Sequence, residues 1–341
     1  MAGGAGLHLA ARLEDAVHAF RVRRGLRRGL VPAVVPYTGY GGDGWARVLG
    51  RVVLLAPDHA SADPLSGVRG WRSFTSIPVR DAEVEVRAGG TTSVIRSDRG
   101  GVLDARIDSA LPPGWHTIEL AIGDDVASAS LMVVDPATRF GVISDIDDTV
   151  MVTLLPRPLL AAWNTFVLDE HARTPVAGMA VLYDRLTHAH PDAPFIYLST
   201  GAWNVVPTLS RFLSRNLYPR GPLLLTDWGP THDRWFRNGP EHKRSSLARL
   251  QAEFPAIRWL LVGDDGQADE RIYGEFVAAH PASVAAVAIR RLTAGQAVLA
   301  GRRKAPAPPE PDGVPWRYAL DGAGLGEELS ELGFLGDEEP G

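Results

Sequence analysis

Residues 140–149 read Phe-Gly-Val-Ile-Ser-Asp-Ile-Asp-Asp-Thr, an apolar run that ends in three carboxylates and a threonine. An uninterrupted apolar run is typical of a strand buried on both faces of a parallel sheet. Ligands of open α/β sheets bind at the carboxyl ends of such strands. Carboxylates this close repel one another unless a cation lies among them, and hard oxygen ligands suit Mg²⁺. The alternative interpretation is an acidic, solvent-exposed turn. Three further motifs follow in the chain, and they argue against this alternative.

Strand-like and helix-like stretches alternate from Arg139 onward. Such alternation predicts a parallel sheet with helices on both faces. The expected strands are Phe140–Ser144, Phe195–Ser199, Leu223–Thr226, Trp259–Val262 and Val284–Ile289. The expected helices are Leu159–Ala172, Val176–Ala189, Val205–Asn216, His242–Glu253 and Glu270–Ala279.

The region before this alternation, residues 31–137, has the pattern of a β domain. Val84 and Val86 alternate with Glu83, Glu85 and Arg87, as in a strand with one buried face. Short strands separated by Gly, Pro and Asp turns predict a small β-sandwich. No catalytic constellation occurs there, so we expect a binding or scaffolding module.

Both ends of the chain differ from these two domains. A helical pattern over residues 6–22 leads into a basic run, residues 1–30 forming one segment with Arg21, Arg23, Arg24, Arg27 and Arg28. Such a stretch can bind an anionic membrane, or it can dock on its own protein with a solvated basic end. Residues 301–341 are rich in Pro, Gly and acidic residues, which predicts a disordered tail, with Trp316 and Tyr318 docking back as the alternative. The catalytic domain is then residues 138–300.

Composition limits the function classes. The net charge of −5 argues against a general polyanion binder, so we expect no nucleic-acid partner. The absence of cysteine excludes disulfides and thiolate metal sites and fits a reducing compartment. No secretory signal or membrane-spanning run is evident, which favours a cytoplasmic protein, at most peripheral to a membrane. The oligomeric state stays open.

Three further motifs follow the first acidic strand end. The second strand ends in Ser199-Thr200-Gly201, whose hydroxyl and backbone N–H groups can bind a phosphate. Lys243 lies at the start of the predicted helix His242–Glu253, and a cation at a helix N-terminus is unfavourable unless an anion lies nearby. The fourth strand ends in Gly263-Asp264-Asp265, followed by Asp269. A helix cap and a surface lysine are the ordinary alternatives, but two acidic clusters at one sheet edge can share one cation.

In this order, Asp145-x-Asp147-x-Thr149, Ser199, Lys243 and Gly263-Asp264-x4-Asp269 resemble the four motifs of haloacid dehalogenase superfamily phosphotransferases. The resemblance covers about residues 139–290. Residues 144–149, Arg173-Thr-Pro175, Trp203-Asn204 and His242-Lys243 are similar to the actin-patch phosphatidate phosphatase family, in a bacterial-type form with a lipin-like catalytic domain. This resemblance implies a Rossmann-like sheet without a large cap.

The resemblance also implies roles for residues. Asp145 would be the nucleophile that forms an aspartyl-phosphate, and Asp147 the general acid and base. Mg²⁺ would bind Asp145, the backbone carbonyl of Asp147, and Asp264, with Asp265 or Asp269 as support or alternate ligand. Ser199 and Lys243 would hold phosphate oxygens. The residues expected to bind substrate are Thr200, Gly201, Trp203, Asn204 and Arg173.

The implied function is a magnesium-dependent phosphomonoester phosphatase. Phosphatidate or another lipid phosphate is the first candidate substrate, which would place the enzyme in lipid metabolism. One alternative is a phosphatase acting on a soluble or protein phosphate. The other is a non-catalytic binding module, which the presence of every implied catalytic and metal-binding carboxylate argues against.

Overall fold

The computed structural model describes residues 16–57, 77–152, 174–226, 232–266, 268–293 and 313–336. The chain divides into two compact units, one mainly of residues up to Leu131 and the other mainly from Met132 onward. The predicted helix Leu159–Ala172 and the predicted substrate residue Arg173 lie outside the described residues. Among the helices that are described, none is both long enough and apolar enough to span a bilayer.

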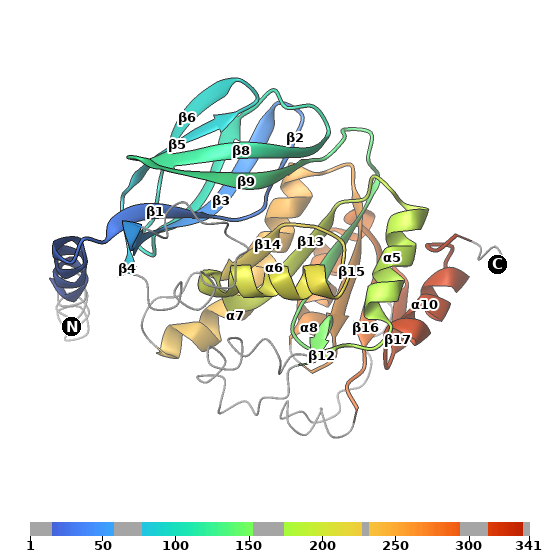
Figure 1. Cartoon of the computed structure of the whole chain (residues 1–341). Coiled ribbons are helices and arrows are strands. Elements are labelled where there is room, and N and C mark those ends of the chain that lie inside the picture. The colour runs from blue at the N-terminus through green and yellow to red at the C-terminus, as the bar shows by residue number, and fades with distance from the viewer. Residues whose placement is uncertain are drawn as a thin grey trace, which may run out of the picture. The chain divides into compact units, whose positions relative to one another are not determined.

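The β-rich N-terminal region forms one hydrogen-bonded sheet, coloured blue to green in Figure 1. Its strand order is β1-β3-β2-β9-β8-β5-β6, and β4 and β7 pair with β3. The alternation predicted for β5 is confirmed, since Val84 and Val86 are buried and Glu83 and Arg87 are exposed. The strands are β1 (Val31–Pro36), β2 (Gly39–Gly42), β3 (Trp45–Leu55), β4 (Ile77–Pro78), β5 (Glu83–Ala88), β6 (Thr91–Arg96), β7 (Val102–Asp108), β8 (Gly114–Ile122) and β9 (Asp125–Val133).

The N-terminal helix is described over residues 16–27, so Arg21, Arg23, Arg24 and Arg27 lie inside the helix rather than after it as predicted, and Arg28 lies in the turn that follows. Gly25 is buried, and a Cβ there would lie 2.8 Å from Leu54 Cδ1 and 3.2 Å from Ile77 Cδ1. This close approach packs one side of the helix against its own unit. The five arginines and Phe20 are exposed to solvent.

The second unit contains the predicted parallel sheet, in the order β14-β13-β10-β15-β16-β17. Its strands are β10 (Phe140–Asp145), β13 (Phe195–Ala202), β14 (Leu223–Thr226), β15 (Arg258–Asp264), β16 (Val284–Arg290) and β17 (Trp316–Ala319). Val142 and Ile143 of β10 are fully buried, which explains why the first motif begins with an apolar run. A separate hairpin pairs β11 (Met151–Val152) with β12 (Thr174–Pro175).

Helices cover both faces of this sheet (Figure 1). They are α5 (Met179–Ala189), α6 (Val206–Arg215), α7 (His232–Glu253), α8 (Asp269–Ala279) and α10 (Gly322–Glu331), with short 3-10 turns η3 (Trp203–Val205) and η4 (Pro281–Ser283). Helix α5 packs against α10, and α7 packs against α8. The Rossmann-like architecture expected from the sequence is therefore present.

Two expectations are corrected by the structure. Helix α7 begins at His232, so Lys243 lies in its interior and not at its start. Proline lacks an N–H and normally marks a helix start or break, so Pro240 conceals this continuation in the sequence.

The second correction concerns the predicted disordered tail over residues 301–341. Within it, β17 adds a sixth parallel strand beside β16, and α10 follows. Trp316, Leu325 and Leu329 are buried, and Asp321 caps α10 by accepting a hydrogen bond from Gly324 N at 3.0 Å. The proline- and glycine-rich composition of this segment hides the apolar side chains that pack against the rest of the unit.

Candidate active site

The first acidic motif is a tight turn at the end of β10. Backbone N–H groups of Val150 and Met151 both donate to the carbonyl of Ile146, at 3.0 and 3.1 Å. Asp148 has a φ of 59°, a left-handed conformation that aspartate adopts more readily than most residues. The turn therefore holds Asp145 and Asp147 in a defined backbone geometry at the carboxyl edge of the sheet.

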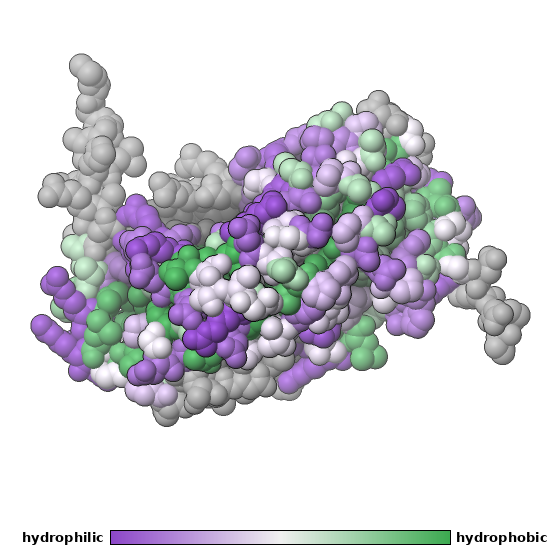
Figure 2. Space-filling view, turned by 90° about the horizontal axis from the view of Figure 1, so that it is seen from above, coloured by the Kyte–Doolittle hydropathy of each residue, from purple (hydrophilic) through white to green (hydrophobic). Residues whose placement is uncertain are grey.

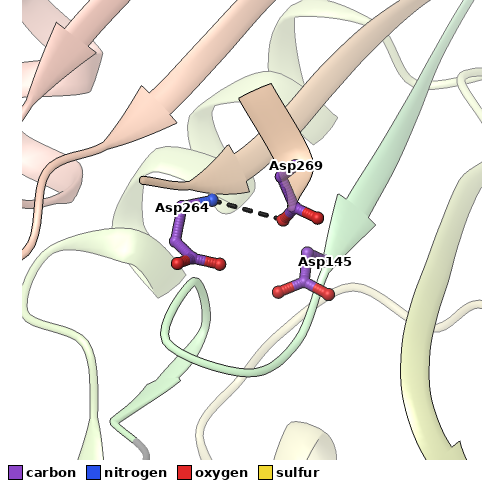
Figure 3. Close-up of side chains that lie close together, drawn as sticks. All are labelled: Asp145, Asp264 and Asp269. Atoms are coloured by element: carbon purple, nitrogen blue, oxygen red, sulfur yellow. Dashed lines mark hydrogen bonds between the residues drawn. The ribbon is translucent and has the colours of Figure 1, made fainter. Parts of the chain in front are cut away.

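Three carboxylates from two neighbouring strand ends converge at this edge (Figure 3). Asp145 ends β10, Asp264 ends β15, and Asp269 begins α8; one oxygen of each lies within 4.8 Å of the others. All three are buried. Asp264 N donates to Asp269 Oδ2 at 3.4 Å, and Gly266 N donates to Asp264 Oδ1 at 2.6 Å. We call Asp145, Asp264 and Asp269 the acidic cluster.

Lys243 supplies a positive charge to the acidic cluster. Its Nζ donates to Asp145 Oδ1 at 2.6 Å and to Asp269 Oδ1 at 2.5 Å. Burial alone would lower the pKa of this ammonium, but the charges of the two aspartates outweigh burial, and the pKa is raised. Lys243 is therefore protonated, and α7 carries it into the site from the middle of the helix.

One lysine does not balance the charge of the acidic cluster. Burial raises the pKa of Asp145 and of Asp264 well above the usual 3.8, the negative charge of Asp269 adds to this, and Lys243 opposes it. A divalent cation would favour the ionised forms. Buried, hard carboxylate oxygens at this spacing are the donor set that Mg²⁺ prefers, so the residues fit the metal implied by the sequence.

The motif after β13 bonds directly to the first one. Ser199 Oγ donates to Asp147 Oδ2 at 3.0 Å and accepts from Gly201 N at 2.9 Å. Thr226 Oγ1, at the end of β14, lies 3.0 Å from the carbonyl oxygen of Thr200 and 2.9 Å from that of Gly201. The expected acid–base residue is thereby tied to the expected phosphate-binding turn.

The predicted substrate residues of this turn differ in burial and in hydrogen bonding. Trp203 is buried in η3, and Thr200 is partly exposed. The Oδ1 atom of Asn204 is buried and accepts no hydrogen bond in the part of the chain that the structure describes. A buried acceptor without a donor is uncommon.

Asp265 and Asp269 lie in different surroundings. Asp265 Oδ1 accepts from Leu292 N at 2.9 Å, in the loop after β16. Asp269 belongs to the acidic cluster instead. Gly263 makes this arrangement fit, because a Cβ there would lie 2.7 Å from Asp269 Oδ2. Thr149 Oγ1 donates to Asp145 Oδ2 at 3.4 Å.

Sequence reasoning missed a buried hydrogen-bond chain behind the nucleophile candidate. Ser144 Oγ donates to the carbonyl of Asp145 at 2.6 Å, and Tyr183 Oη lies 2.6 Å from the same Oγ. Ser144 gives its one hydroxyl hydrogen to the Asp145 carbonyl, so Tyr183, whose pKa is raised by burial, donates to Ser144. A tyrosine at a core position of α5 has no distinctive sequence signal, which is why Tyr183 was not found.

Comparison with known proteins finds similarity over the region that contains these residues. Residues 140–291 match the family model described as "Phosphatidate phosphatase APP1, catalytic domain". The chain is 26% identical over 151 residues to Phosphatidate phosphatase APP1 of Saccharomyces cerevisiae, covering 44% of this chain and 25% of that protein. It is 28% identical over 171 residues to an uncharacterized protein of Schizosaccharomyces pombe, covering 49% of this chain and 28% of that protein. The chain thus matches about a quarter of the length of these relatives.

Among solved structures, the chain is similar to the HAD domain of effector protein Lem4 from Legionella pneumophila. The TM-score is 0.31 at 15% identity, covering 46% of this chain and 87% of that one. An uncharacterized protein from Listeria monocytogenes gives a TM-score of 0.33 at 13% identity, covering 57% and 98% of the two chains.

Proposed function

We propose that this chain, which carries an APP1-like phosphatase domain of the haloacid dehalogenase type in residues 140–291, is a magnesium-dependent phosphomonoester phosphatase. The observation that carries the proposal is the buried contact of Lys243 with both Asp145 and Asp269, beside Asp264, within the matched region. A buried carboxylate with a fixed ammonium neighbour, at the carboxyl end of a parallel strand, is suited to attack on a phosphoryl group.

The proposed reaction has two steps. In the first, a carboxylate oxygen of Asp145 attacks phosphorus, the phosphorus–oxygen ester bond breaks, and Asp147 gives its proton to the leaving alkoxide. In the second, Asp147 takes a proton from water, the hydroxyl attacks phosphorus, and phosphate leaves with Asp145 regenerated. Ser199, bonded to Asp147, is the group that keeps the acid–base residue beside the phosphate-binding turn.

Mg²⁺ would be held by Asp145, Asp264 and the backbone carbonyl of Asp147, with Asp269 orienting Lys243 or serving as an alternate ligand. When bound, the cation supplies positive charge that stabilises the phosphoryl oxygens. Lys243 adds a fixed positive charge on the same side, which the buried surroundings strengthen. Thr200, Gly201, Trp203, Asn204 and Arg173 would contact the rest of the substrate.

We propose that the substrate is a lipid phosphomonoester such as phosphatidate, which the enzyme binds at an anionic membrane surface. The name of the Saccharomyces cerevisiae relative supports the substrate class. The basic helix supports the location, because the side chains of Arg21, Arg23, Arg24, Arg27 and Arg28 are exposed and, within the described residues, form no ion pair or side-chain hydrogen bond. We expect a cytoplasmic protein that binds membranes peripherally.

The test is phosphate release by the purified protein, with and without Mg²⁺, from phosphatidate in mixed micelles and from water-soluble phosphomonoesters. The proposal expects metal-dependent release, fastest from the lipid. Release from soluble esters alone would favour the alternative of a soluble or protein phosphate. No release from any ester would favour a non-catalytic binding module.

A further inference from the structure

Arg290 is a buried charged residue at the end of the apolar strand β16. Its exposed fraction is 4%, and every other residue of the strand is apolar and buried. In the sheet, Arg290 is the register partner of Asp264 on one side and of Ala319 on the other. A buried guanidinium is costly unless it is hydrogen-bonded and near opposite charge, so its contacts call for an explanation.

The guanidinium of Arg290 bonds to the turn that carries the nucleophile candidate. Its Nη1 donates to the carbonyl of Asp148 at 2.6 Å. Asp148 is the residue with the left-handed backbone, and its own N–H donates to the carbonyl of Met151 at 2.7 Å. The bond therefore constrains the peptide between Asp148 and Thr149, one residue beyond the proposed acid–base residue Asp147.

The same guanidinium also reaches the C-terminal segment. Its Nε donates to the carbonyl of Leu320 at 3.2 Å, between β17 and α10. That carbonyl is well anchored, since Arg291 N donates to Ala319 O at 2.7 Å and Gly322 N donates to Ala177 O at 2.9 Å. Residues 313–336 lie beyond the matched region 140–291, yet they contribute this support.

Burial lowers the pKa of Arg290, and the negative charges of Asp148, Asp264, Asp265 and Asp321 oppose that effect. The backbone carbonyl of Arg290 also accepts from Asp265 N at 3.0 Å. One residue therefore joins the turn after β10, the acidic loop after β15 and the C-terminal segment.

We propose that Arg290 is a positioning residue, which fixes the Asp145–Met151 turn for phosphoryl transfer and makes the C-terminal segment 313–336 part of the catalytic support. It acts through the Asp148 carbonyl. The inference rests on the proposed function, because its kinetic readout is phosphatase turnover.

The experiment compares Arg290→Gln and Arg290→Lys with Arg291→Gln. Arg291 is a matched control, because it is the next residue and its guanidinium lies 4.9 Å from the Tyr318 ring rather than on the turn. We expect Arg290→Gln to lower kcat about 10–100-fold, the usual range for residues that support catalytic groups from behind, with KM nearly unchanged. Arg290→Lys should be intermediate, because an ammonium keeps the charge but lacks the planar fork that reaches two carbonyls.

Hydrogen exchange provides a readout that does not depend on turnover. The backbone amides of residues 148–151 should exchange faster in both Arg290 variants than in wild type, and should not change in Arg291→Gln. If Arg290→Gln does not fold, Arg290→Lys decides both measurements.

Wild-type kcat together with wild-type exchange in Arg290→Lys or Arg290→Gln would overturn the inference, as would an equal loss of kcat in Arg291→Gln. A folded wild-type protein that hydrolyses no phosphomonoester would overturn the proposed function instead, and exchange of residues 148–151 would still decide whether Arg290 fixes the turn.

Discussion

At the scale of single residues, the acidic cluster combines two requirements that oppose each other. In the proposed reaction Asp145 must be ionised to attack phosphorus, yet burial raises its pKa. Lys243 meets part of this requirement through a hydrogen bond of 2.6 Å to Asp145 Oδ1. The remaining excess of negative charge should lower the stability of the folded protein when no cation is bound.

Asp145→Asn tests the nucleophile. The amide is nearly the same size but cannot attack phosphorus, so we expect kcat to fall at least about 10³-fold while the fold is kept. Steady-state hydrolysis with saturating Mg²⁺ measures the loss, and thermal unfolding of the same sample controls for folding. Turnover close to wild type in a well-folded sample would contradict the assignment.

Stability should depend on pH in a direction set by the same carboxylates. The pKa values of Asp145 and Asp264 are raised in the folded state, so the folded protein binds more protons than the unfolded chain above pH 3.8. Their contribution to stability is full below pH 3.8 and is lost as pH rises through the raised pKa values. In chelator, we therefore expect this contribution to Tm to fall as the pH rises above 3.8 and through the raised pKa values.

Asp264→Asn is the matched variant, because it removes one of the two carboxylates without changing its size. In chelator, at pH values above the raised pKa values, the variant should have a higher Tm than wild type, and its free energy of unfolding should be larger by about 1–2 kcal/mol. Mg²⁺ should stabilise the variant less than it stabilises wild type. The difference in Tm between wild type and variant, measured across the pH range, isolates the effect from other titrating groups. A difference that does not change with pH would count against the electrostatic account.

At the scale of elements, the site depends on how α10 reaches α5. Gly178, which precedes α5, has a φ of 73°, and Gly322 begins α10. The two backbones meet so closely that a Cβ on Gly322 would collide with the carbonyl carbon of Gly178. This contact leads directly to the Leu320 carbonyl that Arg290 binds.

Two glycine-to-alanine variants should therefore have opposite effects on stability. Gly322→Ala overpacks the contact between α5 and α10, which should destabilise the protein by about 1–3 kcal/mol. Gly274→Ala lies inside α8 with nothing within 4 Å of the added Cβ, and should stabilise it by about 0.5–1 kcal/mol through helix propensity. Chemical denaturation measures both, and effects of the same sign would contradict the proposed packing.

At the scale of the whole molecule, the two units carry separate proposed tasks. The parallel-sheet unit carries all the proposed catalytic groups that are described, and the β-rich region carries the exposed basic helix. The two tasks can therefore be measured independently in the full-length protein.

Metal dependence is the first whole-molecule prediction. Phosphatase activity should vanish in chelator, return with Mg²⁺, and be lower with Ca²⁺, whose looser coordination holds reacting oxygens less well. Phosphate release after dialysis against chelator and after readdition of each ion measures this. Undiminished activity after exhaustive chelation would refute the proposed metal site.

Membrane binding is the second. Replacing all five arginines of the N-terminal helix with glutamine should strongly weaken sedimentation with anionic vesicles, because each basic residue near such a surface contributes about 1 kcal/mol, screened by salt. Hydrolysis of a small soluble ester should be almost unchanged, since none of these arginines belongs to the proposed site.

A matched pair of double variants sharpens this test. Arg23→Gln with Arg24→Gln should weaken vesicle binding about 30-fold, because the two arginines together contribute about 2 kcal/mol to the binding free energy. Arg87→Gln with Arg96→Gln removes the same charge from exposed arginines that already pair with glutamates, and should have a small effect. Equal effects of the two pairs, or binding by wild type that salt does not change, would defeat the membrane proposal while leaving the phosphatase assignment intact.

The sequence by itself determined the parallel sheet and the order of its acidic motifs. Buried strands appear as apolar runs, and their carboxyl ends meet at one edge, so local pattern alone predicted that the acidic motifs of Asp145 and Asp264 would come together, and the family resemblance added Ser199. The structure places Ser199 on Asp147 at 3.0 Å and Asp264 in the acidic cluster. These are consequences of strand topology, which short segments encode.

Only the tertiary structure decided which neighbouring groups complete the site. It placed Asp269 in the acidic cluster and bonded Asp265 to Leu292, although the two aspartates stand four residues apart. It also put Tyr183 behind Asp145 and Arg290 on the Asp148 carbonyl, a contact between residues 142 positions apart in the chain. Such contacts depend on which side chains several packed elements bury together, and no local periodicity carries that information.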